Sequence, residues 1–316
     1  MKTLPPIALG TWSWGSGFAG GDQVFGNHLD ADSLRPVFDL AMQKGLTLWD
    51  TAAVYGMGSS ETILGTLAKT VSGKTLQLST KFTPQLASPE ADNPVAAMFE
   101  QSCQRLGSEI IDLYWIHNPT LLNEWTRHLI PLLQSGRIRR VGVSNHNLAE
   151  IKLVDSTLKQ AGFALSAVQN HYSLLYRSSE DAGILDYCRE NDITFFSYLV
   201  LEQGALSGKY NASHPLPEGS SRAASYNSEL PQLEALTDAM RDIGSGKSAS
   251  VAQVAIAWAI AKGTLPIIGV TKLKHVEDAA AATTLQLSPE EIKTLERLAV
   301  QAGVDTRGAW EKPMHS

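Results

Sequence analysis

Four side chains that together could move a proton are spread over the first half of this 316-residue chain. Asp50 and Lys81 each end a short apolar run, and Tyr55 follows Asp50 within the same loop. His117 ends a further apolar run. A free phenol titrates near pH ~10, but a neighbouring ammonium favours the phenolate and lowers its pKa. We therefore expect Lys81 to make Tyr55 a general acid that protonates a carbonyl oxygen.

Two other interpretations of the lysine and the aspartate stay open. A buried ion pair between Asp50 and Lys81 could be purely structural, although such a pair gains little over apolar packing. Lys81 could also be the Schiff-base amine of a lyase or aldolase, but a paired carboxylate would keep that amine protonated and unreactive. Carbonyl reduction needs a hydride donor in addition, because no side chain here is a suitable reductant.

The elements that must position these residues follow a regular alternation along the chain. Short apolar runs predict strands at residues 6–9, 46–50, 76–81, 113–117, 140–144, 167–170, 194–198 and 265–268. Amphipathic stretches predict helices at about 32–44, 60–70 (capped by Ser60), 94–106, 122–135, 148–160, 184–191, 233–243, 251–262, 274–283 and 289–302. Parallel strands need long crossovers, so the pattern predicts an α/β fold, a (β/α)8 TIM barrel with inserted loops at its C-terminal face. We expect one domain over residues 1–316.

In such a barrel the carboxyl ends of all strands open on one face, where the chemistry lies. One polar strand end usually meets only loop backbone, but ionisable groups ending apolar strands carry a desolvation cost that a function would explain. The predicted strands two to seven deliver, in order, Asp50, Lys81, His117, Ser144 with Asn145, Gln169 with Asn170, and Tyr198.

Composition argues against several other classes of protein. The chain is 43% hydrophobic and 18% charged with a formal net charge of −6, which allows a large core but offers no basic face for nucleic acid. No apolar run is long enough to span a membrane, and no signal-peptide h-region follows the start Met-Lys-Thr-Leu-Pro-Pro, so we expect neither a membrane span nor a secretory signal, and a cytoplasmic protein. Cys103 and Cys188 lack CxxC spacing and are expected to be reduced, buried thiols.

Three further motifs are interpreted as structural. Residues 15–20 match GxGxxG, but the next predicted helix begins about twelve residues later, so we expect a flexible active-site loop instead of a phosphate cradle. The histidines show no metal-ligand spacing, and we expect no metal. The tryptophans are expected in the core, except Trp12 and Trp14 at the mouth; the core set is Trp49, Trp115, Trp125, Trp258 and Trp310.

The segment from Asp50 to Gly65, Asp-Thr-Ala-Ala-Val-Tyr-Gly-Met-Gly-Ser-Ser-Glu-Thr-Ile-Leu-Gly, resembles the signature of the aldo-keto reductases. The resemblance covers nearly the whole chain. Tyr172 and Arg177, which follow Gln169, are closer to the branch with bacterial general reductases and potassium-channel β subunits. The further matching segments are Ser79-Thr-Lys81, Asp112-Leu-Tyr-Trp-Ile-His117-Asn-Pro119, Gly142-Val-Ser-Asn145, Gly204-Ala-Leu-Ser-Gly-Lys-Tyr210 and Pro266-Ile-Ile-Gly269.

The resemblance implies an NADP-dependent oxidoreductase that reduces small aldehydes or ketones to alcohols within a TIM barrel. It implies NADPH as cofactor, with NADH possible, and a catalytic tetrad of Asp50, Tyr55, Lys81 and His117, in which Tyr55 donates the proton and His117 orients the carbonyl. The resemblance also implies a set of residues that hold the cofactor along its length, from the nicotinamide carboxamide and ring to the pyrophosphate and the 2′-phosphate. They are Thr11, Trp12, Ser144, Asn145, Gln169, Tyr198, Leu201, Gln203, Leu206, Gly208, Lys209, Gly269, Thr271, Lys272, His275 and Asp278.

Two positions depart from that family pattern. Strand seven continues as Tyr198-Leu-Val-Leu201 where the branch often has Tyr-Ser-Pro-Leu, and Asn118 stands where many relatives carry an aromatic.

Arg222 either clamps the cofactor or faces water. The alternative for the whole chain is a nicotinamide-binding regulatory subunit with vestigial catalysis. The complete tetrad argues against this alternative. The substrate, the oligomeric state and the loops at 15–30 and 207–231 are left open.

Overall fold

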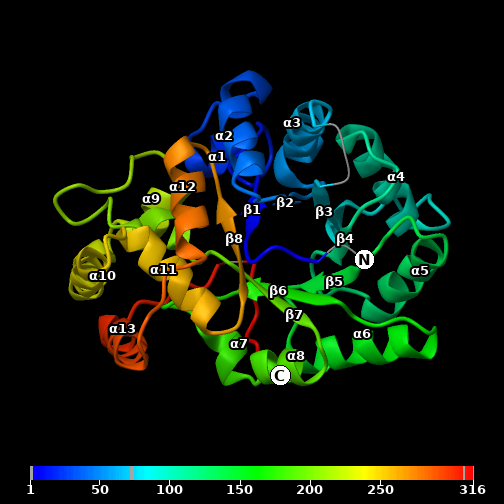
Figure 1. Cartoon of the computed structure of the whole chain (residues 1–316). Coiled ribbons are helices and arrows are strands. Elements are labelled where there is room, and N and C mark those ends of the chain that lie inside the picture. The colour runs from blue at the N-terminus through cyan, green and yellow to red at the C-terminus, as the bar shows by residue number, and fades with distance from the viewer. Residues whose placement is uncertain (1–2, 72–74, 309, 316) are drawn as a thin grey trace.

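Eight parallel strands close into a barrel in chain order, with β8 pairing back onto β1 (Figure 1). This computed structural model describes residues 3–71, 75–308 and 310–315. The predicted (β/α)8 TIM barrel is confirmed. Its strands are β1 (Ala8–Gly10), β2 (Leu48–Asp50), β3 (Gln77–Phe82), β4 (Leu113–Ile116), β5 (Val141–Ser144), β6 (Ala167–His171), β7 (Thr194–Tyr198) and β8 (Leu265–Gly269).

Helices surround this barrel on its outside (Figure 1). The crossover helices are α2 (Ala31–Gln43), α3 (Ser59–Ala68), α4 (Pro94–Leu106), α5 (Leu122–Gln134), α6 (Leu148–Gln160), α8 (Ile184–Glu190) and α11 (Val251–Ala261), and α12 (Leu273–Ala282) follows β8. Shorter or additional elements are α1 (Gly21–Phe25), α7 (Ser178–Asp181), α9 (Ser221–Tyr226), α10 (Glu234–Gly246), α13 (Pro289–Ala302), η1 (Tyr55–Gly58), η2 (Pro84–Leu86), η3 (Glu202–Ser207) and η4 (Leu230–Leu233).

Two local predictions are wrong in the loops that follow β1 and β2. A short helix, α1, begins directly after Gly20 instead of about twelve residues later, because Asp22 folds back and accepts the Gly17 backbone N–H at 3.0 Å. Ser60 does not cap α3, whose N-cap is Gly58 in the left-handed region. The Ser60 hydroxyl instead donates to the Thr11 carbonyl at 2.8 Å, which ties α3 to the end of β1.

The barrel interior is filled by side chains and is not a channel. Trp115 from β4 is the largest of these, and it fits because its neighbour on β5 is Gly142. A Cβ atom at Gly142 would lie 2.3 Å from the Trp115 ring. The remaining buried members of this inner layer are Ala8, Leu48, Leu113, Ala167, Phe196 and Leu265.

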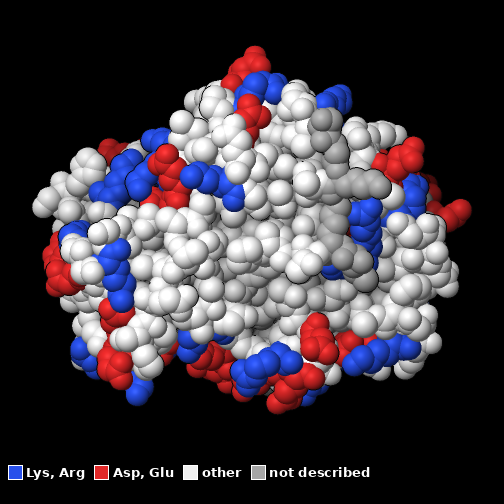
Figure 2. Space-filling model, in the orientation of Figure 1, with Lys and Arg blue, Asp and Glu red and all other residues white. Residues whose placement is uncertain are grey.

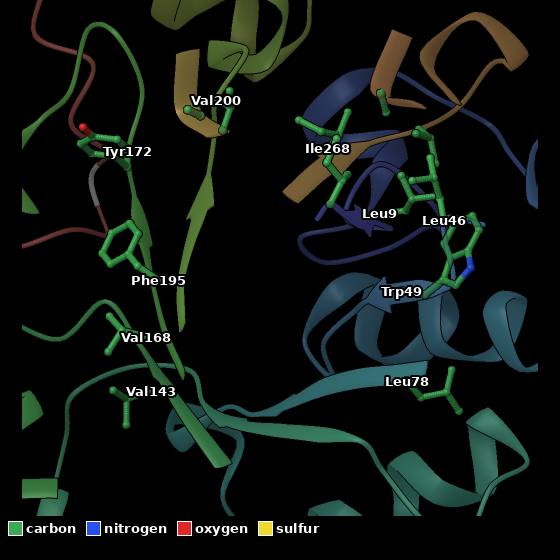
Figure 3. Packing of buried hydrophobic residues seen from close by; sticks show 14 of the residues in the cluster. Leu9, Leu46, Trp49, Leu78, Val143, Val168, Tyr172, Phe195, Val200 and Ile268 are labelled. Atoms are coloured by element: carbon green, nitrogen blue, oxygen red, sulfur yellow. The ribbon is translucent and has the colours of Figure 1, made fainter. Parts of the chain in front are cut away.

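A second, larger apolar layer lies between strands and helices, and Figure 3 shows part of it, including Val168 and Phe195 beside their strands. Trp14 belongs to this layer. It is fully buried against Trp49, and its Nε1 donates to the Val270 carbonyl, so its expected place at the mouth is wrong. Trp310 is also misassigned, because it is 50% exposed and not in the core.

The cysteines, the hydropathy of the helices and the surface charge were also addressed by the sequence predictions. Cys103 and Cys188 are free and buried, as expected. Within the residues that the structure describes, no helix is long and apolar enough to cross a bilayer. Basic and acidic side chains are intermixed on the face that Figure 2 presents, so no single sign of charge dominates it.

Candidate active site

A buried ion pair joins the ends of the neighbouring strands β2 and β3. Lys81 Nζ lies 2.5 Å from Asp50 Oδ2 and donates to the Thr51 carbonyl at 2.7 Å, and the lysine side chain is fully buried. Burial alone would lower the pKa of Lys81, but the Asp50 carboxylate and Tyr55 together outweigh it and raise that pKa. Lys81 is therefore held as an ammonium, which removes the nucleophilic amine that a Schiff-base enzyme would need.

The Asp50 carboxylate is itself fixed from inside the barrel. Its Oδ1 accepts from Ser79 Oγ at 2.6 Å, and Ser79 Oγ accepts from Trp115 Nε1 at 2.7 Å. Gln169 Nε2 approaches the same carboxylate oxygen at 3.4 Å. The indole that fills the barrel thus also orients the ion pair at its mouth.

Tyr55 comes to this ion pair from the tight turn η1. Its hydroxyl lies 3.5 Å from Lys81 Nζ. The expected fall in the Tyr55 pKa is wrong: burial raises that pKa, and the opposing effect of the Lys81 charge is smaller. The phenol consequently keeps its proton at neutral pH, as a proton donor must.

His117 lies beside the phenol as a neutral imidazole. Its ring meets the Tyr55 ring edge to face at 6.0 Å, and its Nδ1 is 3.0 Å from the Thr83 hydroxyl. Burial and the Lys81 charge hold the pKa of His117 well below its usual range. When Thr83 donates to Nδ1, the neutral ring carries its proton on Nε2, where it can donate to an oxygen. The structure thus brings all four expected catalytic residues together.

The ends of β5 and β6 carry Ser144, Asn145 and Gln169, whose polar side chains connect to this tetrad. Ser144 and Gln169 are buried neighbours in strand register. Asn145 adopts a positive φ of 64°, and its Nδ2 donates to the His117 carbonyl at 3.0 Å. Its Oδ1 accepts from the Tyr198 hydroxyl at 2.6 Å, so these residues form one connected group.

The segment after β7 contains polar atoms without partners. Gln203 Oε1 and Arg222 Nε are buried and have no hydrogen-bond partner among the described residues. Arg222 Nη1 donates to the Gln203 carbonyl, and its guanidinium lies 5.9 Å from the Phe25 and Tyr210 rings, so the expectation that it simply faces water is wrong. The unpartnered Nε–H of this guanidinium is a charged donor that fits an anionic pyrophosphate, whereas the Gln203 oxygen can only accept a hydrogen bond.

The other residues of this segment that we expected to bind the cofactor differ in their burial and in the groups that a ligand could reach. Leu206 is fully buried, so its side chain cannot contact a ligand. Leu201 is half-buried, and Gly208 adopts a positive φ of 73°. Exposed Lys209 donates to the Tyr210 hydroxyl at 3.1 Å.

Beyond β8, the expected phosphate-binding residues surround the start of α12. Gly269 has only the Ser13 hydroxyl within 4.0 Å of a Cβ built on it, which leaves open space above the strand end. The Thr271 backbone N–H donates to His275 Nδ1 at 3.2 Å, and Lys272 is exposed. Asp278 is turned away from this group, because its carboxylate accepts from Ser250, Gln253 and Lys274.

Directly after β1, the Thr11 backbone N–H donates to the Asp50 carbonyl at 3.0 Å, and the Thr11 side chain is buried. Trp12 lines the mouth as expected, stacked on Tyr55 with the ring centroids 6.1 Å apart. The Trp310 ring meets Trp12 edge to face at 5.9 Å.

Sequence reasoning missed several residues at the mouth that belong to segments distant in the chain. Trp310 and Glu311 come from the tail after α13, His171 ends β6 and Glu202 begins η3. No motif connects them in the sequence. The one sequence signal for this group was His171, which lies two residues after the expected cofactor ligand Gln169. Among the described residues, no group of His, Cys, Asp and Glu is arranged to hold a metal ion.

A closed parallel barrel with a lysine, a carboxylate, a phenol and an imidazole at its C-terminal mouth defines a (β/α)8 barrel enzyme. The sequence model of the aldo/keto reductase family matches residues 6–300. The chain belongs to this family, whose members are oxidoreductases acting on carbonyl compounds.

Individual relatives agree with that assignment along most of the chain. A chloroplastic pyridoxal reductase of Arabidopsis thaliana is 33% identical over 95% of this chain and 84% of its own length. A glycerol dehydrogenase of Gluconobacter oxydans matches in structure with a TM-score of 0.80 and 26% identity, over 95% of this chain and 92% of that one. An aldo-keto reductase of Klebsiella pneumoniae, solved with NADPH, has a TM-score of 0.72 and 25% identity over 94% and 91% of the two chains.

Proposed function

We propose that this protein reduces aldehydes or ketones to alcohols with NADPH, and that Tyr55 is the proton donor. The observation that carries the proposal is the Tyr55 hydroxyl 3.5 Å from a lysine that is itself bonded to Asp50. A protonated phenol beside a fixed positive charge is suited to give up its proton once negative charge develops on a carbonyl oxygen. His117, as a neutral donor, would orient that oxygen.

For the cofactor we propose that Ser144, Asn145 and Gln169 hold the carboxamide and that Tyr198 stacks on the nicotinamide ring. When bound, NADPH supplies the hydride that no side chain of this protein can supply. Arg222, whose buried Nε–H has no partner among the described residues, supports a pyrophosphate site. Thr271, Lys272 and His275 supply donors and charge for the 2′-phosphate at the start of α12, and the NADPH complex of the Klebsiella relative supports the choice of NADPH.

For the substrate we propose planar aromatic aldehydes. Trp12 stacks on Tyr55 and is flanked by Trp310, so the phenol faces a wall of indole rings on which a flat ring can stack. The name of the Arabidopsis relative makes pyridoxal one aldehyde to test. The free, buried cysteines support a reducing compartment such as the cytoplasm.

The proposal is tested by NADPH oxidation with benzaldehyde, pyridoxal and an aliphatic aldehyde, in the wild type and in Tyr55→Phe. We expect Tyr55→Phe to lower kcat by at least about 100-fold, the usual contribution of a positioned general acid. Calorimetric titration with NADPH and NADH should show tighter binding of NADPH and little change in the variant. Tyr187→Phe is the matched control, because that phenol bonds Asp155 between α6 and α8 and not the tetrad.

Two outcomes would contradict the proposal in different ways. Equal turnover by the wild type and Tyr55→Phe would remove Tyr55 from the proton-donor role. Tight NADPH binding by the wild type with no turnover of any carbonyl would favour the regulatory-subunit alternative.

A further inference from the structure

Three aromatic rings are stacked behind the nicotinamide site that we propose. Tyr176 stacks on His171 with centroids 4.3 Å apart and an interplanar angle of 16°. His171 stacks in turn on Tyr198 at 5.6 Å and 21°. One face of the Tyr198 ring is therefore covered by His171, and a nicotinamide stacking on Tyr198 would lie on its other face.

Both ring nitrogens of His171 face carboxylates. Nε2 is 2.9 Å from Glu202 Oε1, and Nδ1 is 3.0 Å from Glu311 Oε1, and all three side chains are fully buried. An imidazole that donates from both nitrogens carries a positive charge. Burial alone would lower the pKa of His171, but Glu202 and Glu311 outweigh it and raise the pKa to about 9.

The other partners of the two carboxylates are neutral. Glu202 accepts from the hydroxyls of Ser173, Thr306 and Tyr226. Glu311 accepts from the Gly308 backbone N–H at 2.7 Å, and its Oε1 lies 2.6 Å from the Tyr198 hydroxyl. The neighbouring tail cation, Lys312, is paired with Glu150. Two carboxylates thus share one imidazolium, which leaves a net charge of one negative unit directly behind Tyr198.

We propose that Glu202 and Glu311 make the back of the nicotinamide site electronegative and thereby favour the oxidised, positively charged form of the cofactor. Carbonyl reduction breaks a C–H bond of the dihydronicotinamide, sends its electron pair to the carbonyl carbon, takes a proton from Tyr55 and leaves positive charge on the ring. A fixed negative charge behind Tyr198 stabilises that developing charge. Glu311 acts through Tyr198 and is a positioning residue. This inference rests on the proposed function.

The test compares the binding of NADP⁺ and NADPH by calorimetric titration in the wild type and in Glu311→Gln. Glutamine keeps the shape of the side chain and removes the charge. We expect the ratio of the Kd for NADP⁺ to the Kd for NADPH to rise roughly tenfold, the effect of one charge about 10 Å away at an effective dielectric constant of about 20. A merely structural loss would weaken both ligands alike and leave the ratio unchanged.

Glu150→Gln is the matched control, because it removes an equal charge and also releases a contact of the tail, but through Lys312. Its ratio of Kd values should stay within about twofold of the wild type. Glu202→Gln makes the same change on the other side of His171, so it serves if Glu311→Gln does not fold. A ratio unchanged in the folded variant overturns the inference. A wild type that binds neither nucleotide contradicts the proposed function instead.

Discussion

Lys81 is a fully buried ammonium at the mouth of the barrel, and a carboxylate must neutralise its charge there. Asp50 compensates it at 2.5 Å, and the inner indole of Trp115 orients Asp50 through Ser79. Because burial, and to a smaller extent the Asp50 charge, raise the pKa of Tyr55, the phenol does not become acidic in the resting protein. The lysine charge is instead available to stabilise a phenolate formed after proton transfer.

The tetrad could be predicted at this scale because each member ends a strand or follows one closely. The cluster around His171 could not. Glu202 and Glu311 lie 31 and 140 residues from His171, and only the three-dimensional arrangement of η3 and the tail brings them to one ring. Asp278 shows the reverse error: the family resemblance implied that it binds the cofactor, but its carboxylate instead accepts from Ser250 and Gln253 at the start of α11.

His171 predicts a specific dependence of stability on pH. Its folded pKa of about 9 exceeds its ordinary 6.5, so its contribution is complete below pH 6.5 and is lost as the pH rises through 9. The full difference corresponds to about 3 kcal/mol. Urea unfolding should therefore show the wild type losing stability between pH 6.5 and 9.5 relative to His171→Gln. Parallel curves for the two proteins would show that His171 is not an imidazolium in the folded state.

At the scale of elements, local signals determined how well each segment could be predicted. The bounds of α4, α6 and α13 were predicted correctly, and two of these helices begin with a capping box, Asn147 with Glu150 and Ser288 with Glu291. The short elements α1, α7 and α9 were not predicted, because a helix of a turn or two depends on tertiary contacts and not on periodicity. Residues 207–231, expected as a loop, contain α9 over a small apolar cluster with Tyr226 and Leu230.

Gly142 on β5 is the element-scale position at which we expect a single methyl group to be costly. In Gly142→Ala the new Cβ atom would lie 2.3 Å from the Trp115 ring, which cannot move away inside the packed barrel. We expect a loss of about 1–3 kcal/mol in the free energy of unfolding, measured by urea titration. Gly246→Ala, on α10 with nothing within 4 Å of the added atom, is the control and should be neutral or stabilising. Equal stability of both variants would mean that the barrel interior is loosely packed.

At the scale of the whole molecule, the C-terminal tail connects the last helix to the mouth of the barrel. Met314 is buried and belongs to the main apolar layer, while Glu311 and Lys312 bond residues of β6 and α6. The sequence after α13 carries no periodic pattern, and therefore the tail could not be predicted as part of the site. We propose that barrel, helices and tail form a single domain.

A single domain should unfold in one cooperative step. We expect the urea transitions followed by far-UV circular dichroism and by tryptophan fluorescence to coincide, because the tryptophans are distributed over β2, β4, α11 and the tail. Excess NADPH should shift both transitions to higher urea by the same amount, since it binds only the folded chain. Two separated transitions would contradict the single-domain proposal.

Closure of the sheet has a consequence for how this protein behaves at high concentration. Each of the eight strands is paired on both sides, so β1 and β8 present no unpaired backbone to a neighbouring molecule. Aggregation by strand pairing therefore requires that two neighbouring strands of the barrel first separate. We call such a pair of neighbouring strands a seam. Aggregation at high concentration should therefore depend on the opening of the β1–β2 and β7–β8 seams, each with only two residue pairs in register, more than on surface composition.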